Sequence, residues 1–195
     1  MDKQKIIAFF DRLADGWDAE LQKDEGKINA ILDAAGIAEG KAVLDIACGT
    51  GVMFPYYLGR NVAHITGADI APKMLAVAAS KFGGNEKIEL ICADAEQYHF
   101  EKQYDCCMIF NAFPHFGAPQ ALIENLMTAL KAGGTLTVAH DWGRKALDRH
   151  HREEANEVSC GLMSETDLAQ LFAACGLKEI YTCATEDIYI VSGVK

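Results

Sequence analysis

The chain lacks the features that mark membrane-spanning, secreted and nucleic-acid-binding proteins. No apolar run approaches the roughly 20 residues needed to cross a bilayer, so we expect no membrane span. Met1 to Lys5 and the short apolar patch after them do not form a signal peptide. The net charge is −10, which argues against a nucleic-acid partner because phosphate binding requires a basic surface. Internal repeats, linkers and low-complexity segments are missing as well.

The chain also has no Cys-x-x-Cys pair, although it contains seven cysteines. An odd number without that spacing indicates reduced thiols and predicts a cytoplasmic protein. Cys106 and Cys107 are neighbours in a predicted strand, so their side chains should face opposite sides of a sheet. The remaining candidate ligands match no standard metal spacing, and we expect no metal site. They are His140, His150, His151 and Cys160.

The length of 195 residues and the 50% hydrophobic content predict one globular unit with a substantial core. Strands are predicted at 41–46, 64–68, 87–92, 104–110 and 134–139. Helices are predicted between them, at 50–59, 72–82, 94–98 and 118–131, and residues 4–36 are predicted to be mostly helical. Such alternation predicts a parallel sheet covered by helices on both faces.

The end of the chain differs from this pattern. A charge-rich helix over 144–157 and a second helix over 165–175 precede two β-rich runs, at 177–183 and 187–191. Their short link favours an antiparallel hairpin, because parallel strands need a long crossover. The predicted fold is therefore a doubly wound α/β sheet of seven mostly parallel strands with a C-terminal antiparallel hairpin.

Residues 43–51, Val-Leu-Asp-Ile-Ala-Cys-Gly-Thr-Gly, form the most informative stretch. An apolar strand runs into a glycine turn and then a helix start, an arrangement that cradles a nucleotide-like ligand. Gly49 and Gly51 allow positive φ and close approach of the backbone. A dinucleotide fingerprint needs a third glycine, where this chain has Phe54, so a nicotinamide oxidoreductase is disfavoured.

Acidic residues recur at the ends of the first three predicted strands, at intervals of one strand–helix unit. They are Asp45, Asp69 and Asp94. A carboxylate at the end of the second strand of such a unit is placed to accept both ribose hydroxyls. The glycine turn and the acidic strand ends together predict a site for a nucleotide-like ligand.

The run Asp-x-x-x-Gly-x-Gly from Asp45 to Gly51 resembles motif I of the class I S-adenosylmethionine (SAM)-dependent methyltransferases. The stretch from Thr66 to Leu75 resembles the second motif of that family, although Ala71 stands where a capping serine is common. Two further stretches, at 9–18 and 111–115, are similar to the small-molecule, ubiquinone-biosynthesis-like (type 11) group. The resemblance covers roughly residues 40–195 at the level of the fold, and implies a Rossmann-like sheet.

The resemblance implies SAM as cofactor and assigns residues to it. Asp69 would bind the ribose, Asp94 the adenine amino group, and Asn111 would flank the methionine end. The full expected cofactor set is Asp45, Ala47, Cys48, Gly49, Gly51, Asp69, Ile70, Met74, Asp94, Ala95 and Asn111. Residues 1–36 would form a helical lid or cap, and residues 37–195 the methyltransferase domain.

The acceptor would bind against the lid and the loops after the fourth and fifth strands. Phe10, Trp17, Phe113 and Phe116 are the expected pocket and lid residues. His115 is a candidate general base because its ordinary pKa lies near neutrality, or else a packed loop histidine. His140 and Asp141 are further catalytic candidates. The hypothesis is methyl transfer to a small-molecule acceptor by a monomer or homodimer. The alternative is a protein that binds SAM or S-adenosylhomocysteine (SAH) without transferring a methyl group.

Overall fold

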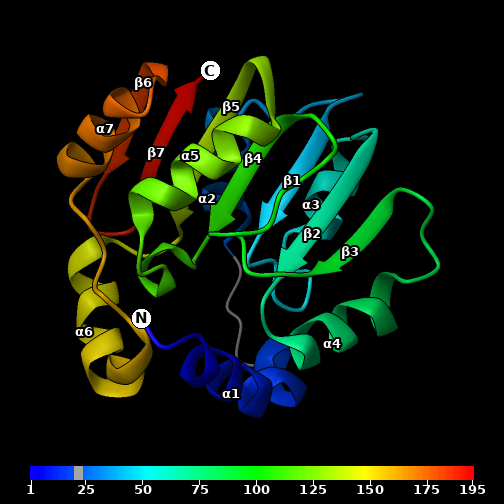
Figure 1. The fold of residues 1–195 in the computed structure, drawn as a ribbon, viewed down its shortest axis with the longest axis vertical. Helices are drawn as coiled ribbons and strands as arrows, with labels where there is room; N and C mark the ends of the chain where they lie inside the picture. The colour runs from blue at the N-terminus through cyan, green and yellow to red at the C-terminus, as the bar shows by residue number, and fades with distance from the viewer. Residues whose placement is uncertain (20–23) are drawn as a thin grey trace.

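The computed structural model describes residues 1–19 and 24–195. Its centre is a seven-stranded sheet in the order β3-β2-β1-β4-β5-β7-β6 (Figure 1). The strands are β1 (Ala42–Ile46), β2 (His64–Asp69), β3 (Ile88–Cys92), β4 (Tyr104–Phe110), β5 (Leu130–His140), β6 (Lys178–Ala184) and β7 (Tyr189–Val194). Pairing is parallel from β3 to β5, whereas β7 runs antiparallel to both β5 and β6. The predicted fold and its C-terminal antiparallel hairpin are confirmed.

The strand order reverses beside β1. The chain runs outward from β1 to β2 and β3, and then returns to place β4 on the other side of β1, with Leu44 opposite Cys107. The carboxyl ends of β1 and β4 therefore separate into loops that leave in different directions. In open α/β sheets this reversal point is where ligands bind.

Two helical layers cover the sheet. They use α2 (Glu25–Ala34), α3 (Phe54–Gly59), α4 (Pro72–Phe82), α5 (Pro119–Ala129), α6 (Arg144–Glu154) and α7 (Glu165–Ala174). On one face α2 and α3 pack over a core that includes Cys106, and on the other α5 and α7 pack over a core that includes Cys107. The prediction that these two cysteines face opposite sides is thus confirmed. Full burial of a large apolar side chain such as Phe54 or Phe172 contributes about 1.5–3 kcal/mol.

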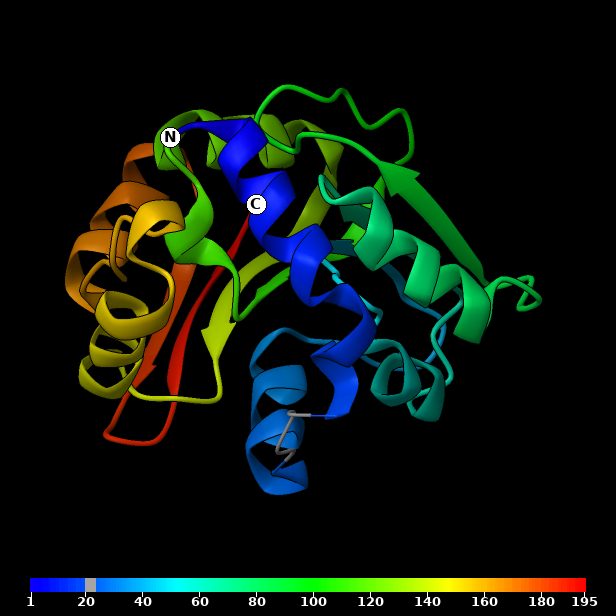
Figure 2. The same cartoon turned by 90° about the horizontal axis from the view of Figure 1, so that it is seen from below.

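Residues 3–19 lie across the carboxyl ends of the strands (Figure 2). Helix α1 (Lys3–Leu13) begins at the Asp2 cap and continues into a 3-10 turn, η1 (Ala14–Ala19). Figure 2, viewed from below, shows α1 crossing the strand ends. Ile6 packs against the 3-10 turn η3 (Asn156–Val158), and Ala14 packs against α4. By contrast, α2 contributes Ile28, Ile31 and Leu32 to the core of the sheet. The helical prediction over 4–36 includes 20–23, which lie outside the described residues.

The predicted helix at 94–98 is wrong, because residues 94–97 form a turn. The Asp94 side chain accepts the amide N–H of Glu96, the contact that a helix N-cap makes, but the chain continues for a single turn. The side chain of Asn125, on α5, donates to the carbonyls of Ala95 and Tyr98, which therefore do not need helical partners. A tertiary contact thus replaces the local hydrogen bonds that a helix would have supplied.

Two other boundaries differ from the predictions. Helix α3 begins at Phe54 rather than at residue 50, because the amide N–H groups of Gly51 and Phe54 donate to Cys48 and Gly51 in successive turns. Strand β5 begins at Leu130 rather than at 134, since Leu130 already pairs with Tyr104 of β4. Both differences come from the neighbouring strands and turns rather than from the local residue preferences.

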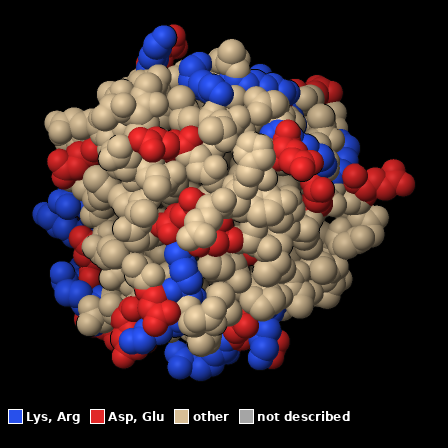
Figure 3. All heavy atoms as spheres, in the orientation of Figure 1, with Lys and Arg blue, Asp and Glu red and all other residues tan. Residues whose placement is uncertain are grey.

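Acidic and basic groups are interspersed on the face seen in Figure 3. Among residues 1–19 and 24–195, no helix is both long and apolar enough to cross a bilayer.

Candidate functional site

A cavity of about 970 Å³, counted out to its opening, lies where the carboxyl ends of β1, β2 and β4 meet the loop after β3 beneath α1. We call it the strand-end cavity. The predicted residues that line it are Phe10, Trp17, Asp45, Ala47, Cys48, Gly49, Asp69, Ile70, Met74, Asp94, Ala95, Asn111, His115 and Phe116. Most of the site residues predicted from the sequence therefore line one continuous cavity.

The turn after β1 requires its glycines for two different reasons. Gly49 and Gly51 have φ values of 55° and 79°, and Ala47 adopts the same left-handed region at 54°. Gly49 forms part of the cavity wall, whereas Gly51 lies outside it. A Cβ atom on Gly51 would come within 2.8 Å of the Phe54 ring and 2.9 Å of the Phe82 ring. Gly51 therefore sets how closely α3 and α4 approach the turn.

Asp69 fastens this turn to the end of β2. One carboxylate oxygen accepts the amide N–H of Gly49 at 2.8 Å, and the other accepts the amide N–H of Ala71 at 2.8 Å. Burial raises the pKa of Asp69, although these amide hydrogen bonds oppose the rise. A carboxylate has about four acceptor positions, so each oxygen keeps a lone pair for a ligand hydroxyl.

Asp45 is the most deeply buried acid at the cavity. It is 2% exposed, and burial raises its pKa to about 8. The Tyr57 hydroxyl makes no hydrogen bond of regular geometry with the described residues, yet it lies close enough to Asp45 to favour the carboxylate form. The charge of nearby Asp69 acts in the opposite direction. Asp45 is therefore largely protonated at neutral pH until a positive charge enters the cavity.

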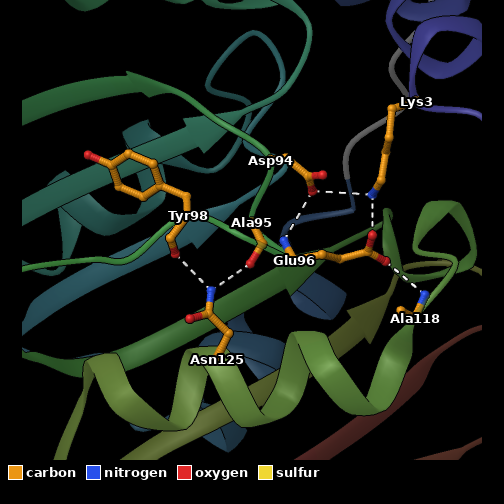
Figure 4. A network of polar contacts seen from close by, with 7 residues as sticks. All are labelled: Lys3, Asp94, Ala95, Glu96, Tyr98, Ala118 and Asn125. Atoms are coloured by element: carbon orange, nitrogen blue, oxygen red, sulfur yellow. Dashed lines mark hydrogen bonds and ion pairs between the residues drawn. The ribbon is translucent and has the colours of Figure 1, made fainter.

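Asp94 begins the turn after β3, at the same mouth of the cavity. Its Oδ1 atom accepts the amide N–H of Glu96 at 3.1 Å and lies 3.2 Å from the ammonium of Lys3 (Figure 4). Within the described part of the chain, these are the hydrogen bonds that Asp94 makes through its side chain. The other oxygen, Oδ2, is left for a ligand donor.

Asn111 and Asp141 form a reciprocal pair beyond β4 and β5. The Asn111 side-chain amide donates to the Asp141 carboxylate at 2.8 Å, and the Asp141 amide N–H donates back at 3.2 Å. Asn111 has φ of 52° and lines the cavity, whereas Asp141 does not. Burial raises the pKa of Asp141, and the hydrogen bond from Asn111 opposes this. Asp141 is thus placed to orient Asn111 rather than to touch a ligand in this cavity.

His115 follows β4 and is the only one of the three catalytic candidates, His115, His140 and Asp141, that lines the cavity. Its Nδ1 atom lies 2.7 Å from the carbonyl oxygen of Val158, and a carbonyl can only accept, so Nδ1 carries the proton. Burial lowers the pKa of His115, against the effect of that hydrogen bond. The ring is therefore neutral at pH 7, and Nε2, which makes no hydrogen bond with the described residues, can accept a proton.

His140 and Phe113 lie inside the fold instead of at the cavity. Phe113 belongs to the core under α5. His140 is fully buried against the Tyr189 ring, at 5.9 Å between ring centroids, and neither ring nitrogen has a hydrogen-bond partner among the described residues. Burial lowers the pKa of His140 to about 3, so it remains uncharged.

Several residues of the wall were not predicted from the sequence. They are Lys3, Ile6, Val52, Met53, Ala68, Ala93, Phe110 and Ala112. Most of them adjoin predicted residues along the chain, so extending each motif by one or two positions would have found them. Lys3 is different, because nothing in the local sequence separates it from an ordinary surface lysine.

Comparisons with known proteins agree with this geometry. Residues 43–134 match the family model described as a methyltransferase domain. The malonyl-[acyl-carrier protein] O-methyltransferase of Acetivibrio thermocellus is 27% identical over 189 residues, covering 95% of this chain and 66% of that protein. The ubiquinone biosynthesis O-methyltransferase of Paraburkholderia phytofirmans is 30% identical over 141 residues, covering 68% and 60%. The chain therefore spans less than two thirds of the length of these relatives.

A solved structure of DhpI in complex with SAH has the same fold. Its TM-score is 0.75 at 17% sequence identity, and the match covers 98% of this chain and 95% of that one. At this identity the likeness shows the fold alone.

The two glycines of the turn should differ in their tolerance of a side chain. Gly49→Ala adds only the strain of a left-handed residue, about 1–2 kcal/mol, because no atom lies within 4 Å of the new Cβ. Gly51→Ala adds the same strain and a clash with two aromatic rings, worth about 1–3 kcal/mol more. Urea unfolding of both variants measures the difference. Equal losses of stability would show that the rings move aside without cost.

Asp45→Asn should change how stability depends on pH. The raised pKa means that the folded state keeps a proton that the unfolded state releases above pH 4. The wild-type protein therefore loses stability relative to the variant as the pH rises from 4 towards 8. We expect the free energy of unfolding of the variant, relative to that of the wild type, to rise by at least about 1 kcal/mol between pH 5 and pH 8. Urea unfolding at both pH values measures this, and a pH-independent difference would contradict it.

Proposed function

We propose that this chain is a class I SAM-dependent methyltransferase and that it transfers a methyl group from SAM to a small-molecule acceptor. The observation that carries the proposal is the convergence of the glycine turn and three acidic strand ends on one cavity. Asp45, Asp69 and Asp94 all line it, although they lie on three separate strand ends. A cationic adenosyl ligand fits such an acidic, largely apolar cavity.

The chain offers a suitable group at each part of the cofactor. The lone pairs of Asp69 are available to ribose hydroxyls, and Oδ2 of Asp94 is available to the adenine amino group. Asp45 would become charged when a sulfonium or ammonium group approaches, since a nearby positive charge lowers a carboxyl pKa. When bound, SAM supplies a methyl group that is already activated for displacement.

The remaining part of the site aligns the acceptor and excludes water. Ile6, Phe10 and Phe116 form an apolar wall beside His115. Exclusion of water and correct orientation are the main contributions that a protein makes to such a displacement. Residues 3–18, the part of the predicted lid that crosses the strand ends, would close this side of the cavity. The apolar wall supports an acceptor that is small, largely apolar and uncharged.

An oxygen acceptor is the best-supported class. The relatives from Acetivibrio thermocellus and Paraburkholderia phytofirmans described above are both named as O-methyltransferases. A hydroxyl group must lose its proton as it is methylated, and Nε2 of neutral His115 can receive that proton. We therefore propose His115 as general base. The cysteine usage supports a reducing compartment such as the cytoplasm.

Titration calorimetry with SAM and SAH tests cofactor binding. Asp69→Asn should weaken binding of SAH by about tenfold or more, because two charge-assisted hydrogen bonds are lost. Asp105→Asn is a matched control, because Asp105 also accepts a backbone N–H, but from Ala42 at 2.9 Å, at the opposite end of β1 from the turn that Asp69 contacts. It should bind SAH within twofold of the wild type. No binding of either ligand to the wild type would refute the proposal.

His115→Asn tests the general base. The Asn side chain keeps a donor for the Val158 carbonyl but has no counterpart of Nε2. With a panel of hydroxyl acceptors and SAH release as the readout, kcat should fall by about 100-fold while the Kd for SAH stays within twofold. The exposed His150→Asn is the control. Unchanged kcat would exclude His115 as the base. Binding of SAM without turnover of any acceptor would favour the binding protein that lacks transfer activity.

A further inference from the structure

Polar side chains of the segment 3–18 contact the turn after β1, the start of α4 and the turn after β3. Asp18 accepts a hydrogen bond from the Thr50 hydroxyl in the loop after β1, at 2.5 Å. Asp11 accepts the amide N–H of Lys73 at 2.8 Å, and so caps α4, where Ala71 provides no side-chain cap. Lys3 pairs with Asp94 and Glu96 in the turn after β3. Of the residues 3, 11 and 18, Lys3 is the one that lines the cavity.

The surroundings of Lys3 fix its ammonium at the mouth of the cavity. It lies 3.2 Å from Oδ1 of Asp94 and forms a shorter ion pair with Glu96 (Figure 4). It also lies 5.9 Å from the centroid of the Phe116 ring. Glu96 is held in turn, because its other oxygen accepts the amide N–H of Ala118 at 2.8 Å. Side-chain exposure is 25% for Lys3 and 9% for Glu96, so water screens this pair less than an open surface pair.

Lys3 and two backbone amides together outweigh the effect of burial on the pKa of Glu96. Burial by itself would raise the pKa of Glu96, but the hydrogen bond and charge of Lys3, with the amides of Gly117 and Ala118, lower it overall. Glu96 is therefore ionised and available as a fixed counter-charge. Because Glu96 does not line the cavity, it can hold Lys3 without competing for a ligand.

We propose that Lys3 is a positioning residue that latches α1 over the cavity, so that release of a bound cofactor requires the Lys3–Asp94–Glu96 contact to open. This rests on the proposed function, since the cofactor is taken to occupy the cavity below α1. Lys3 and the amide N–H of Glu96 both donate to Oδ1 of Asp94, which leaves Oδ2 as the acceptor for a ligand. One ammonium thus closes the mouth and orients the carboxylate behind it.

The dissociation rate of SAH measures the latch directly. Stopped-flow dilution, followed by the fluorescence of the cavity residue Trp17, should show a roughly three- to tenfold faster rate for Lys3→Met, the scale expected for one partly buried ion pair. Glu96→Gln should accelerate release similarly, and the double variant should be no faster than Lys3→Met alone. Raising the salt concentration should accelerate release from the wild type but not from Lys3→Met.

Two controls separate the latch from a general loosening of α1. Lys5→Met changes a lysine on the same helix whose ammonium has no ion pair among the described residues, and should release SAH at the wild-type rate. Lys3→Arg keeps the charge and should restore slow release. Wild-type release from Lys3→Met, or equal acceleration in Lys5→Met, would overturn the proposal.

Hydrogen exchange in the ligand-free protein keeps this test independent of the proposed function. Amides of α1 should exchange faster in Lys3→Met than in the wild type or Lys5→Met, because the contact is present without a ligand. If the wild type does not bind SAH, the proposed function fails and with it the role in cofactor release, whatever the exchange shows. If SAH binds but neither exchange nor release changes in Lys3→Met, only the latch fails.

Discussion

The carboxylate of Asp69 joins the ends of β1 and β2, and the shape of the cavity depends on this contact. It accepts one amide N–H from the glycine turn and another from the start of α4, so it sets the distance between two loops that line the cavity. The turn itself can reach Asp69 because Gly49 adopts positive φ, and it can pack on α3 and α4 because Gly51 has no side chain. A buried carboxylate is costly unless it is hydrogen-bonded, so this loop arrangement and its charge stabilise each other.

Two acids of the cavity are costly to ionise. Burial raises the pKa of both Asp45 and Asp69, so the ionised form of each carries an electrostatic penalty in the ligand-free cavity. A cationic ligand would relieve that penalty, and a neutral analogue would relieve less of it. Burial has the opposite effect on the pKa of His115, which it lowers. The cavity therefore places a neutral imidazole beside acids that favour a cation. One low-dielectric cavity thus accounts for both properties.

The N-terminal segment contacts the turn after β1, the start of α4 and the turn after β3, and so links them to one another. Its Asp11 caps α4 in place of the serine that motif II commonly provides, so the departure at Ala71 is compensated by a residue 60 positions earlier in the chain. Because the same segment carries Phe10, Trp17 and Lys3 into the cavity wall, its packing and the ligand site cannot be separated energetically. A change that frees α1 should therefore act on ligand release before it affects the stability of the sheet.

The sequence by itself determined the sheet, the hairpin and most of the residues that line the strand-end cavity, because these depend on local signals: strand periodicity, glycines that permit positive φ, and acids at strand ends. It could not determine which distant groups meet. The helix expected at 94–98 is absent because Asn125 satisfies its carbonyls, and Lys3 reaches Asp94 only because α1 folds back across the strand ends. His115, His140 and Asp141 were equivalent candidates in the sequence. Tertiary packing alone decided among them, since burial and the direction of each side chain place only His115 at the cavity.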